Sequence, residues 1–343
     1  MKIVIDEKIP YLKETLESFG HEVLAKPGVE IDCNDVVDAG ALFVRTRTKC
    51  NAQLLDGSSV RFIGTATIGY DHIDTCYCRE KGIVWKNAAG CNAEAVLQYV
   101  QSVIYEWAPC VQGLSIGIVG VGEIGSRVAS WASGAGMTVY KNDPPKEALG
   151  MQGCVQLDEI AEKCDIITFH TTLERGGEFP SFHLADKMFF ESIKKCRLLI
   201  NASRGEVVDN MALLDALKQG KVGNTALDVW ENEPYINKDL LDRAFIATPH
   251  IAGYSAEGKM NATKIVLDAF IEFMGEEKKD ALPLLPEPCN NVVVASAERE
   301  AFLAIYSPMN DTVALKANPA EFEELRNNYK LRREPSAYKI MLK

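Results

Sequence analysis

The chain has 343 residues, 47 % of them hydrophobic, which is enough for two or three domains with sizeable cores. Its formal net charge of −11 argues against a nucleic-acid or membrane-surface partner held by overall electrostatics. No signal peptide or membrane span is expected, because residues 1–6 already have the pattern of a strand. The ten cysteines are therefore expected to be reduced thiols in a cytoplasmic protein.

Short apolar runs and helical patterns alternate along the first 86 residues. The pattern predicts five strands, at 2–5, 22–25, 41–45, 61–64 and 83–86, and three helices, at 10–19, 51–55 and 72–81. Such alternation is typical of a parallel α/β domain whose sheet is covered on both faces. Cys76 and Cys78 lie in the third helix without a second pair at zinc-finger spacing, so we interpret them as packing residues and predict no metal site.

A glycine-rich turn between two predicted strands is the central feature of the sequence. A long apolar helix at 92–107 precedes a strand at 115–119, the turn GVGEIG at 120–125, a helix at 126–133 and a strand at 137–140 that leads to Asp143. Strand, G-x-G-x-x-G turn, helix, strand and acid is the order of a dinucleotide-binding unit. The glycine spacing alone is weak evidence, and an ordinary βαβ unit with a glycine turn is the alternative, but the context favours a dinucleotide site.

Each part of this unit has a physical role. Gly120 permits the tight turn, Gly122 lets the backbone approach a pyrophosphate, and Gly125 lets the helix pack closely on the strand. The helix N-terminus, with its free N–H groups and positive dipole end, receives the diphosphate. A carboxylate at Asp143 accepts hydrogen bonds from a ribose diol and repels a 2′-phosphate, so NAD is favoured over NADP.

A second series of helices and strands follows the glycine turn. Helices are predicted at 157–164, 209–219 and 255–274, and strands at 165–169, 197–201, 224–229 and 245–248. A charged and proline-rich passage at 275–288 has the composition of a linker. Beyond it, helices are predicted at 297–306 and 319–333, in a segment too small for a good core, so this tail is expected to dock on a partner or on the main body.

Three segments at the ends of predicted strands carry one arginine, one glutamate and one histidine. They are NASRGEVVD at 201–209, LDVWENEP at 227–234 and TPHIAGY at 248–254. In open α/β sheets the carboxyl ends of the strands line the ligand crevice, so Arg204, Glu233 and His250 are expected to converge there. A lone residue of any of these types would more simply be an ordinary polar residue of a strand-end loop.

These three residue types fit the oxidation of a 2-hydroxy acid. Hydride leaves C2 for a nicotinamide, and the hydroxyl proton goes to a base, for which His250 is suited near neutral pH. A Glu233 carboxylate hydrogen-bonded to the imidazole fixes its tautomer and favours the imidazolium. The planar guanidinium of Arg204 can hold the substrate carboxylate and stabilise developing charge on the C2 oxygen.

The three segments resemble the signature regions of the D-isomer-specific 2-hydroxyacid dehydrogenases. Within that family, VRTRTK at 44–49, FIGTATIGYDHID at 62–74, NAAGCNAEAVLQYV at 87–100 and the late segment 322–334 resemble the 4-phosphoerythronate dehydrogenases. The resemblance spans nearly the whole chain. It implies NAD-dependent oxidation of 4-phospho-D-erythronate at C2 to (R)-3-hydroxy-2-oxo-4-phosphooxybutanoate, on the route to pyridoxal 5′-phosphate (vitamin B6).

The resemblance also implies a fold and a set of site residues. The fold is a Rossmann NAD-binding domain at 92–254, a discontinuous flavodoxin-like α/β substrate domain at 1–91 and 255–280, and a small α+β carboxyl-terminal domain at 286–343 that forms a homodimer. The matching catalytic residues are Arg204, Glu233 and His250. The matching substrate contacts are Thr46, Thr67 and Tyr254, and the matching cofactor residues beyond the glycines are Glu123, Ile124, Asp143, Thr171, Asp228 and Gly253.

The substrate phosphate requires positive charge placed locally in this acidic chain. Arg45, Arg47 and Lys49 cluster around Thr46, and we expect Arg45 to help bind the phosphate beside a nest of main-chain amides at 64–69, unless these charges are only solvated surface. Ala89, Thr46 and Arg47 depart from the residues commoner in the family, all near the expected substrate site.

Two other functions are compatible with the same fold. The first keeps the chemistry and changes the substrate to 3-phosphoglycerate, glycerate or lactate; the GTATIGYDHID and GCNA stretches argue against it. The second is a non-catalytic, NAD-sensing binding protein, because fold alone does not determine function. The presence of Arg204, Glu233 and His250 together favours the enzyme.

Overall fold

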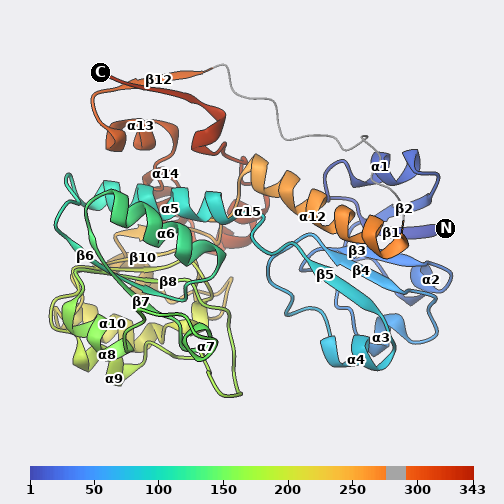
Figure 1. Ribbon diagram of the computed structural model, residues 1–343, viewed down its shortest axis with the longest axis horizontal. Coiled ribbons are helices and arrows are strands. Elements are labelled where there is room, and N and C mark those ends of the chain that lie inside the picture. Colours follow the sequence, from blue (N-terminus) through green and yellow to red (C-terminus); the bar gives the residue numbers. More distant parts are fainter. Residues whose placement is uncertain (276–290) are drawn as a thin grey trace. The chain divides into compact units, whose positions relative to one another are not determined.

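The computed structural model describes residues 1–275 and 291–343, and these form two compact units (Figure 1). Unit 1 contains Met1–Asn92 and the described residues from Ser255 to 275, and unit 2 contains Ala93–Tyr254 and 291–343. Most of the predicted linker at 275–288, and the ends of the predicted domains at 276–280 and 286–290, lie outside the described residues.

Unit 1 is built on a five-stranded parallel sheet of order β2-β1-β3-β4-β5. Its strands are β1 (Lys2–Asp6), β2 (Glu22–Lys26), β3 (Ala41–Val44), β4 (Phe62–Thr65) and β5 (Val84–Asn87). This strand order is the flavodoxin-like one, as the family resemblance implied. All five strands lie within a residue or two of the predicted positions.

Helices cover both faces of this sheet and close its two cores. Side chains of α1 (Leu12–Ser18) and α12 (Ala256–Met274) pack with Ile3, Ile5 and Phe43 on one face. Side chains of α2 (Cys33–Val36), α3 (Ala52–Leu55) and α4 (Thr75–Glu80) pack with Val4 and Leu42 on the other. Cys78 of α4 is fully buried in the second core, in agreement with its interpretation as a packing residue, whereas Cys76 is exposed.

Unit 2 is built on a six-stranded parallel sheet of order β11-β10-β9-β8-β6-β7. Its strands are β6 (Ser115–Val119), β7 (Thr138–Asn142), β8 (Ile166–Phe169), β9 (Leu198–Asn201), β10 (Asn224–Leu227) and β11 (Ile246–Ala247). The helices α5 (Ala93–Trp107) and α6 (Glu123–Gly134) cover one face, and α8 (Leu157–Lys163), α9 (Lys187–Ser192), α10 (Asn210–Lys218) and α11 (Lys238–Arg243) the other (Figure 1).

The strand order of unit 2 reverses direction between β6 and β8. A single parallel bridge between Lys141 and Cys154, next to β7, stands where a doubly wound sheet has its outer strand. This arrangement confirms the predicted Rossmann fold. In such sheets the ligand crevice lies outside the carboxyl ends of the strands at the reversal, so the turn after β6 is the expected cofactor position.

The carboxyl-terminal part of unit 2 packs on the Rossmann sheet and its helices. It contains β12 (Val292–Ala295) and β13 (Lys339–Leu342), paired in parallel, and the helices α13 (Glu298–Ile305), α14 (Met309–Ala317) and α15 (Phe322–Asn327). Leu315 and Phe322 are fully buried in the core beneath α8–α11, and Tyr306 in the core beneath α5 and α6. The tail therefore docks on the main body, one of the two outcomes expected from its size.

The structure corrects the sequence prediction in two places. The helix predicted at 319–333 is a 3₁₀ turn at Pro319–Glu321 followed by α15, which ends at Asn327. Helices α2, α7 (Pro144–Ala148), α9, α11 and α14 were not predicted, and neither were β12 and β13. Four of these helices, α2, α7, α9 and α11, have at most six residues, which is too short for a helical repeat of apolar residues to show in the sequence.

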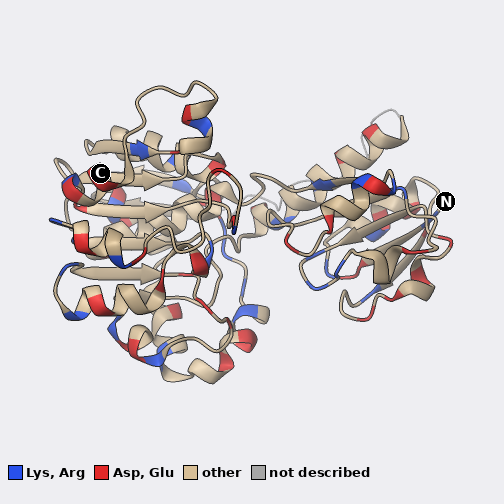
Figure 2. Cartoon of the chain, turned by 90° about the horizontal axis from the view of Figure 1, so that it is seen from below, with Lys and Arg blue, Asp and Glu red and all other residues tan. Residues whose placement is uncertain are grey.

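Charged residues of both signs are interspersed over both units (Figure 2). Among the described residues, no helix combines the length and apolar character needed to cross a membrane. The cysteines that the structure describes are all free thiols.

Candidate active site

His250 and Glu233 form a hydrogen-bonded pair at the carboxyl edge of the Rossmann sheet. Nδ1 of His250 lies 2.8 Å from Oε2 of Glu233, whose Oε1 accepts the main-chain N–H of Trp230 at 3.0 Å. Burial alone raises the pKa of the Glu233 carboxyl, but His250, the Trp230 N–H and Arg326 together hold that pKa below its usual value. The glutamate is thus kept ionised, and the pair can orient the imidazole as a proton acceptor.

The backbone at His250 adopts a conformation that is uncommon for a residue with a side chain. Its φ is +59°, in the left-handed region. The surrounding contacts hold it there, because the His250 N–H donates to the main-chain oxygen of Asp228 at 2.8 Å. Strained residues held in place by their surroundings concentrate at functional sites, and His250 fits that pattern.

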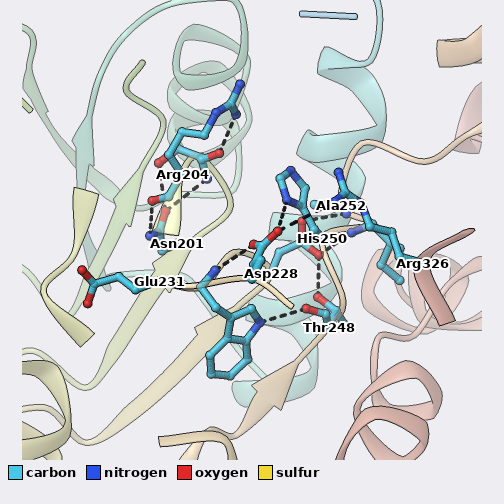
Figure 3. Close-up of polar contacts among 12 residues, drawn as sticks. Asn201, Arg204, Asp228, Glu231, Thr248, His250, Ala252 and Arg326 are labelled. Atoms are coloured by element: carbon cyan, nitrogen blue, oxygen red, sulfur yellow. Dashed lines mark hydrogen bonds and ion pairs between the residues drawn. The ribbon is translucent and has the colours of Figure 1, made fainter. Parts of the chain in front are cut away.

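Asp228 holds the loop that carries His250. Its carboxylate is 1 % exposed and accepts the main-chain N–H groups of Ile251 and Ala252 at 2.8 and 2.9 Å (Figure 3). It also accepts the hydroxyl of Thr248 at 2.7 Å, and Tyr99 Oη lies 2.9 Å from the same hydroxyl. Burial raises the pKa of Asp228. The sequence resemblance matched Asp228 to a cofactor contact; its carboxylate is engaged within the protein.

Arg204 stands at the end of a neighbouring strand. It follows β9, and Asn201 at the strand's end donates through Nδ2 to the main-chain oxygen of Arg204 at 2.9 Å. Nη1 of the guanidinium donates to the main-chain oxygen of Ser203 at 2.8 Å (Figure 3). These contacts fix the direction in which the side chain leaves the strand, and the planar fork of the guanidinium matches the geometry of a carboxylate.

The glycine turn after β6 has the geometry that a dinucleotide requires. Gly120 has φ +88°, and a Cβ there would lie 2.8 Å from the main chain of His170. A Cβ at Gly125 would lie 2.0 Å from the Gly120 oxygen, whereas nothing lies within 4 Å of a Cβ at Gly122. Two glycines therefore permit close packing, and the third leaves open space at the N-terminus of α6, where Glu123 and Ile124 supply free N–H groups.

Two further groups beside the turn fit a dinucleotide. Asp143 follows β7, and its carboxylate accepts the N–H of Val121 at 2.8 Å and that of Lys146 at 3.0 Å, which orients it toward the turn and leaves lone pairs for a diol. The buried hydroxyl of Thr171, just after β8, makes no hydrogen bond in the described structure. An unsatisfied buried hydroxyl next to Gly120 is the kind of group that a ligand completes. The residues present thus fit NAD.

Gly253 lies in the loop between Ala252 and Tyr254, after β11. Tyr254, predicted to contact substrate, is half-buried, and its hydroxyl accepts from Nε of Arg326 at 3.3 Å. Arg326 was not predicted as a site residue. Neither was Lys146, whose Nζ donates to the Val121 oxygen at 2.7 Å.

The remaining predicted substrate residues lie at the carboxyl edge of the unit 1 sheet. Arg45 follows β3 and pairs with the buried carboxylate of Asp6, with Nε 3.0 Å from Oδ2. Thr46 and Arg47 are exposed in the loop that follows. The charge of Arg45 is thus partly neutralised by Asp6, and its role at a phosphate stays a prediction.

Thr67, which follows β4, belongs to a short chain of hydrogen bonds. Its hydroxyl lies 2.7 Å from that of Thr65 and donates to the Gly69 oxygen at 2.9 Å. Nε2 of His72 lies 2.9 Å from the Thr65 hydroxyl, and burial lowers the pKa of His72 to about 4. A neutral His72 therefore supports the loop that presents Thr67, a role that no motif or spacing in the sequence indicates.

The chain is similar along its whole length to proteins named erythronate-4-phosphate dehydrogenase. The protein of Bacteroides fragilis (strain YCH46) is 48 % identical over 347 residues, covering 100 % of this chain and 99 % of that protein. The protein of Escherichia coli O17:K52:H18 is 40 % identical over 356 residues, covering 99 % of this chain and 94 % of that protein. Residues 102–252 match the family model "D-isomer specific 2-hydroxyacid dehydrogenase, NAD binding domain".

Solved structures of similar fold include two dehydrogenases that bind NAD. D-Lactate dehydrogenase from Aquifex aeolicus, solved with NAD and lactic acid, has a TM-score of 0.63 and 25 % identity, over 80 % of this chain and 96 % of that one. NAD-bound 3-phosphoglycerate dehydrogenase from Entamoeba histolytica has a TM-score of 0.66 and 24 % identity, over 80 % and 95 % of the two chains. The second of these likenesses shows the fold alone.

Proposed function

The chain belongs to the erythronate-4-phosphate dehydrogenases of the D-isomer-specific 2-hydroxyacid dehydrogenase family, and from that premise we infer its reaction. It oxidises 4-phospho-D-erythronate at C2 to (R)-3-hydroxy-2-oxo-4-phosphooxybutanoate with NAD, on the route to pyridoxal 5′-phosphate. The main structural support for this chemistry is the His250–Glu233 pair at the end of a Rossmann strand, where Nδ1 of His250 lies 2.8 Å from Oε2 of Glu233.

Different residues of unit 2 have different roles in the reaction. When bound, NAD accepts the hydride from C2 of the substrate. His250, with Nδ1 held by Glu233, is left with Nε2 to take the hydroxyl proton, and the ionised Glu233 stabilises the resulting imidazolium. Arg204 binds the substrate carboxylate through its guanidinium fork and stabilises negative charge on the C2 oxygen.

The proposed substrate contacts are residues that follow strand ends. The hydroxyls of Thr46, Thr67 and Tyr254 hydrogen-bond the substrate, and Arg45 contributes positive charge for its phosphate. Support comes from the position of Arg45, Thr46 and Thr67 at the carboxyl ends of neighbouring strands, the edge where α/β sheets bind ligands.

Turnover assays with a panel of D-2-hydroxy acids test the proposed substrate. We expect kcat/KM, followed by NADH absorbance, to be at least about a hundredfold higher for 4-phospho-D-erythronate than for 3-phosphoglycerate, D-glycerate or D-lactate. D-Glycerate and D-lactate lack the phosphate, and 3-phosphoglycerate is one carbon shorter, so each leaves polar groups of the site unpaired. Each substrate is assayed with and without an added 2-oxo acid, so that slow reoxidation of NADH is not mistaken for inactivity. Preference for another acid, or no hydride transfer from any, would refute the assignment.

We also propose that the chain forms a cytoplasmic homodimer through the ribbon of β12 and β13. One face of this ribbon carries the half-exposed side chains of Val292, Val294 and Met341. Exposed apolar side chains in a row are typical of an interaction surface, and a two-stranded ribbon leaves edges that a second copy can cover. The free thiols fit a reducing compartment.

A charge placed on this face tests the dimer. Val294→Lys is expected to shift the protein from a dimer to a monomer in analytical ultracentrifugation, because it buries an unpaired charge in the contact. Val313→Lys is the matched control, since Val313 is 65 % exposed on α14, away from the ribbon. A Val294→Lys protein that remains dimeric would place the contact elsewhere.

A further inference from the structure

The carboxyl-terminal segment packs directly on the loop that carries His250. Phe322 is fully buried in the core beneath α8–α11 and anchors α15 there. After α15, the buried guanidinium of Arg332 donates to the main-chain oxygens of Ile251 at 2.9 Å, Tyr254 at 3.2 Å and also Ala252. The segment is thus fixed against both ends of the loop.

Arg326 differs from Arg332 in what it contacts. Arg332 donates to main-chain oxygens and to the side-chain oxygen of Gln98 at 3.0 Å, none of which has a proposed role in the reaction. Arg326 reaches two side chains with proposed roles in the reaction: its Nη1 lies 3.9 Å from Oε2 of Glu233, and its Nε donates to Oη of Tyr254 at 3.3 Å. Figure 3 shows Arg326 extending from the carboxyl-terminal segment toward the loop of His250.

The Glu233 oxygen that Arg326 faces is the one that binds the imidazole. The other oxygen is occupied by the Trp230 N–H at 3.0 Å. The side chains of Arg326 and Glu233 are 19 % and 17 % exposed, so solvent screens their attraction only in part. Burial raises the pKa of Glu233, and His250 and Arg326 oppose that effect. A fixed cation at this position therefore favours the ionised carboxylate and restrains the oxygen that orients His250.

We propose that Arg326 is a positioning residue of the active site, which holds the Glu233 carboxylate in place behind His250. The carboxyl-terminal segment then contributes to the chemistry as well as to the fold. The proposal rests on the inferred oxidation, which is tested by the turnover of the wild-type protein. The role of Arg326 is tested separately, by the ratio of kcat between the variants and the wild type.

Three variants separate charge from packing. Arg326→Met keeps the length of the side chain and removes its charge; we expect kcat to fall about tenfold with KM for the hydroxy acid changed less than about threefold. Arg326→Lys restores a cation and is expected to recover kcat to within about threefold of the wild type. Arg299→Met is the control, because Arg299 also ties the carboxyl-terminal segment to the rest of unit 2, through the Tyr105 oxygen of α5 at 2.7 Å, and should leave kcat within about twofold.

A double-mutant cycle with Glu233→Gln decides the mechanism. If Arg326 acts through the Glu233 carboxylate, Arg326→Met should change kcat less than about twofold once that carboxylate is an amide. An equal loss in both backgrounds would overturn the proposal. So would a variant in which only KM for the phosphorylated substrate rises, because Arg326 would then be a substrate ligand.

Discussion

Replacing His250 by Gln is expected to lower kcat about a thousandfold, the range of a lost general base, while NAD affinity stays within about twofold. An amide has nearly the reach of the imidazole and can still donate to Glu233, which lies 2.8 Å from Nδ1 in the wild type. It cannot take a proton from the C2 hydroxyl. Stopped-flow detection of NADH and fluorescence titration with NAD measure the two quantities separately.

The chain contains a close structural match for the control. His183 also has a positive φ, of +49°, and its Nε2 lies 2.7 Å from Oε1 of Glu231. His183→Gln therefore makes the same change in a second His–Glu pair, one that we assign no part in the reaction. We expect it to keep kcat within about threefold of the wild type. Retained turnover in His250→Gln, or an equal loss in both variants, would contradict the assigned role.

The sheets and the strand-end residues could be predicted because each depends on a local pattern. Buried parallel strands appear in the sequence as short apolar runs, so all eleven strands in the two large sheets were located within two residues, even β11, which is only two residues long. The carboxyl ends of parallel strands share one edge, so the sequence alone places Arg204 after β9 and His250 after β11 on the same edge.

The contacts behind those residues could not be predicted, because they depend on distant parts of the chain. Tyr99 and Thr248 look like ordinary residues of a helix and a strand end, and only the fold brings their hydroxyls within 2.9 Å of each other. Arg332 continues an apparent helix in the sequence, yet the chain leaves the helix at Asn328, and its guanidinium binds main-chain oxygens of the His250 loop. Every residue has a main-chain oxygen, so the sequence does not show which of them will accept a hydrogen bond from Arg332.

Asp228→Ala is expected to have the second large effect, on stability and on rate together. The substitution removes the acceptor of three buried donors: the Thr248 hydroxyl and the N–H groups of Ile251 and Ala252. Each unsatisfied buried donor costs about 1 kcal/mol or more, so the free energy of unfolding is expected to fall by about 3 kcal/mol. This loss remains even though the substitution also removes the cost of burying a carboxylate. For unit 2 that corresponds to a fall in melting temperature of about 6–12 °C in a calorimetric scan.

The loss of rate follows from the backbone of His250 rather than from the loss of stability. A residue at φ +59° relaxes when its restraints are removed, and Asp228 provides restraints on both residues that follow it. A shift of about 1 Å in a base can cost about a hundredfold, so kcat well below the melting temperature should fall by that factor. Asp186→Ala is the matched control: it removes a half-buried helix cap that accepts the Phe189 N–H at 2.9 Å, which costs about 1 kcal/mol and leaves His250 untouched. If Asp228→Ala melted early but kept the wild-type kcat, the loop would be held by Arg332 and its other contacts, and not by Asp228.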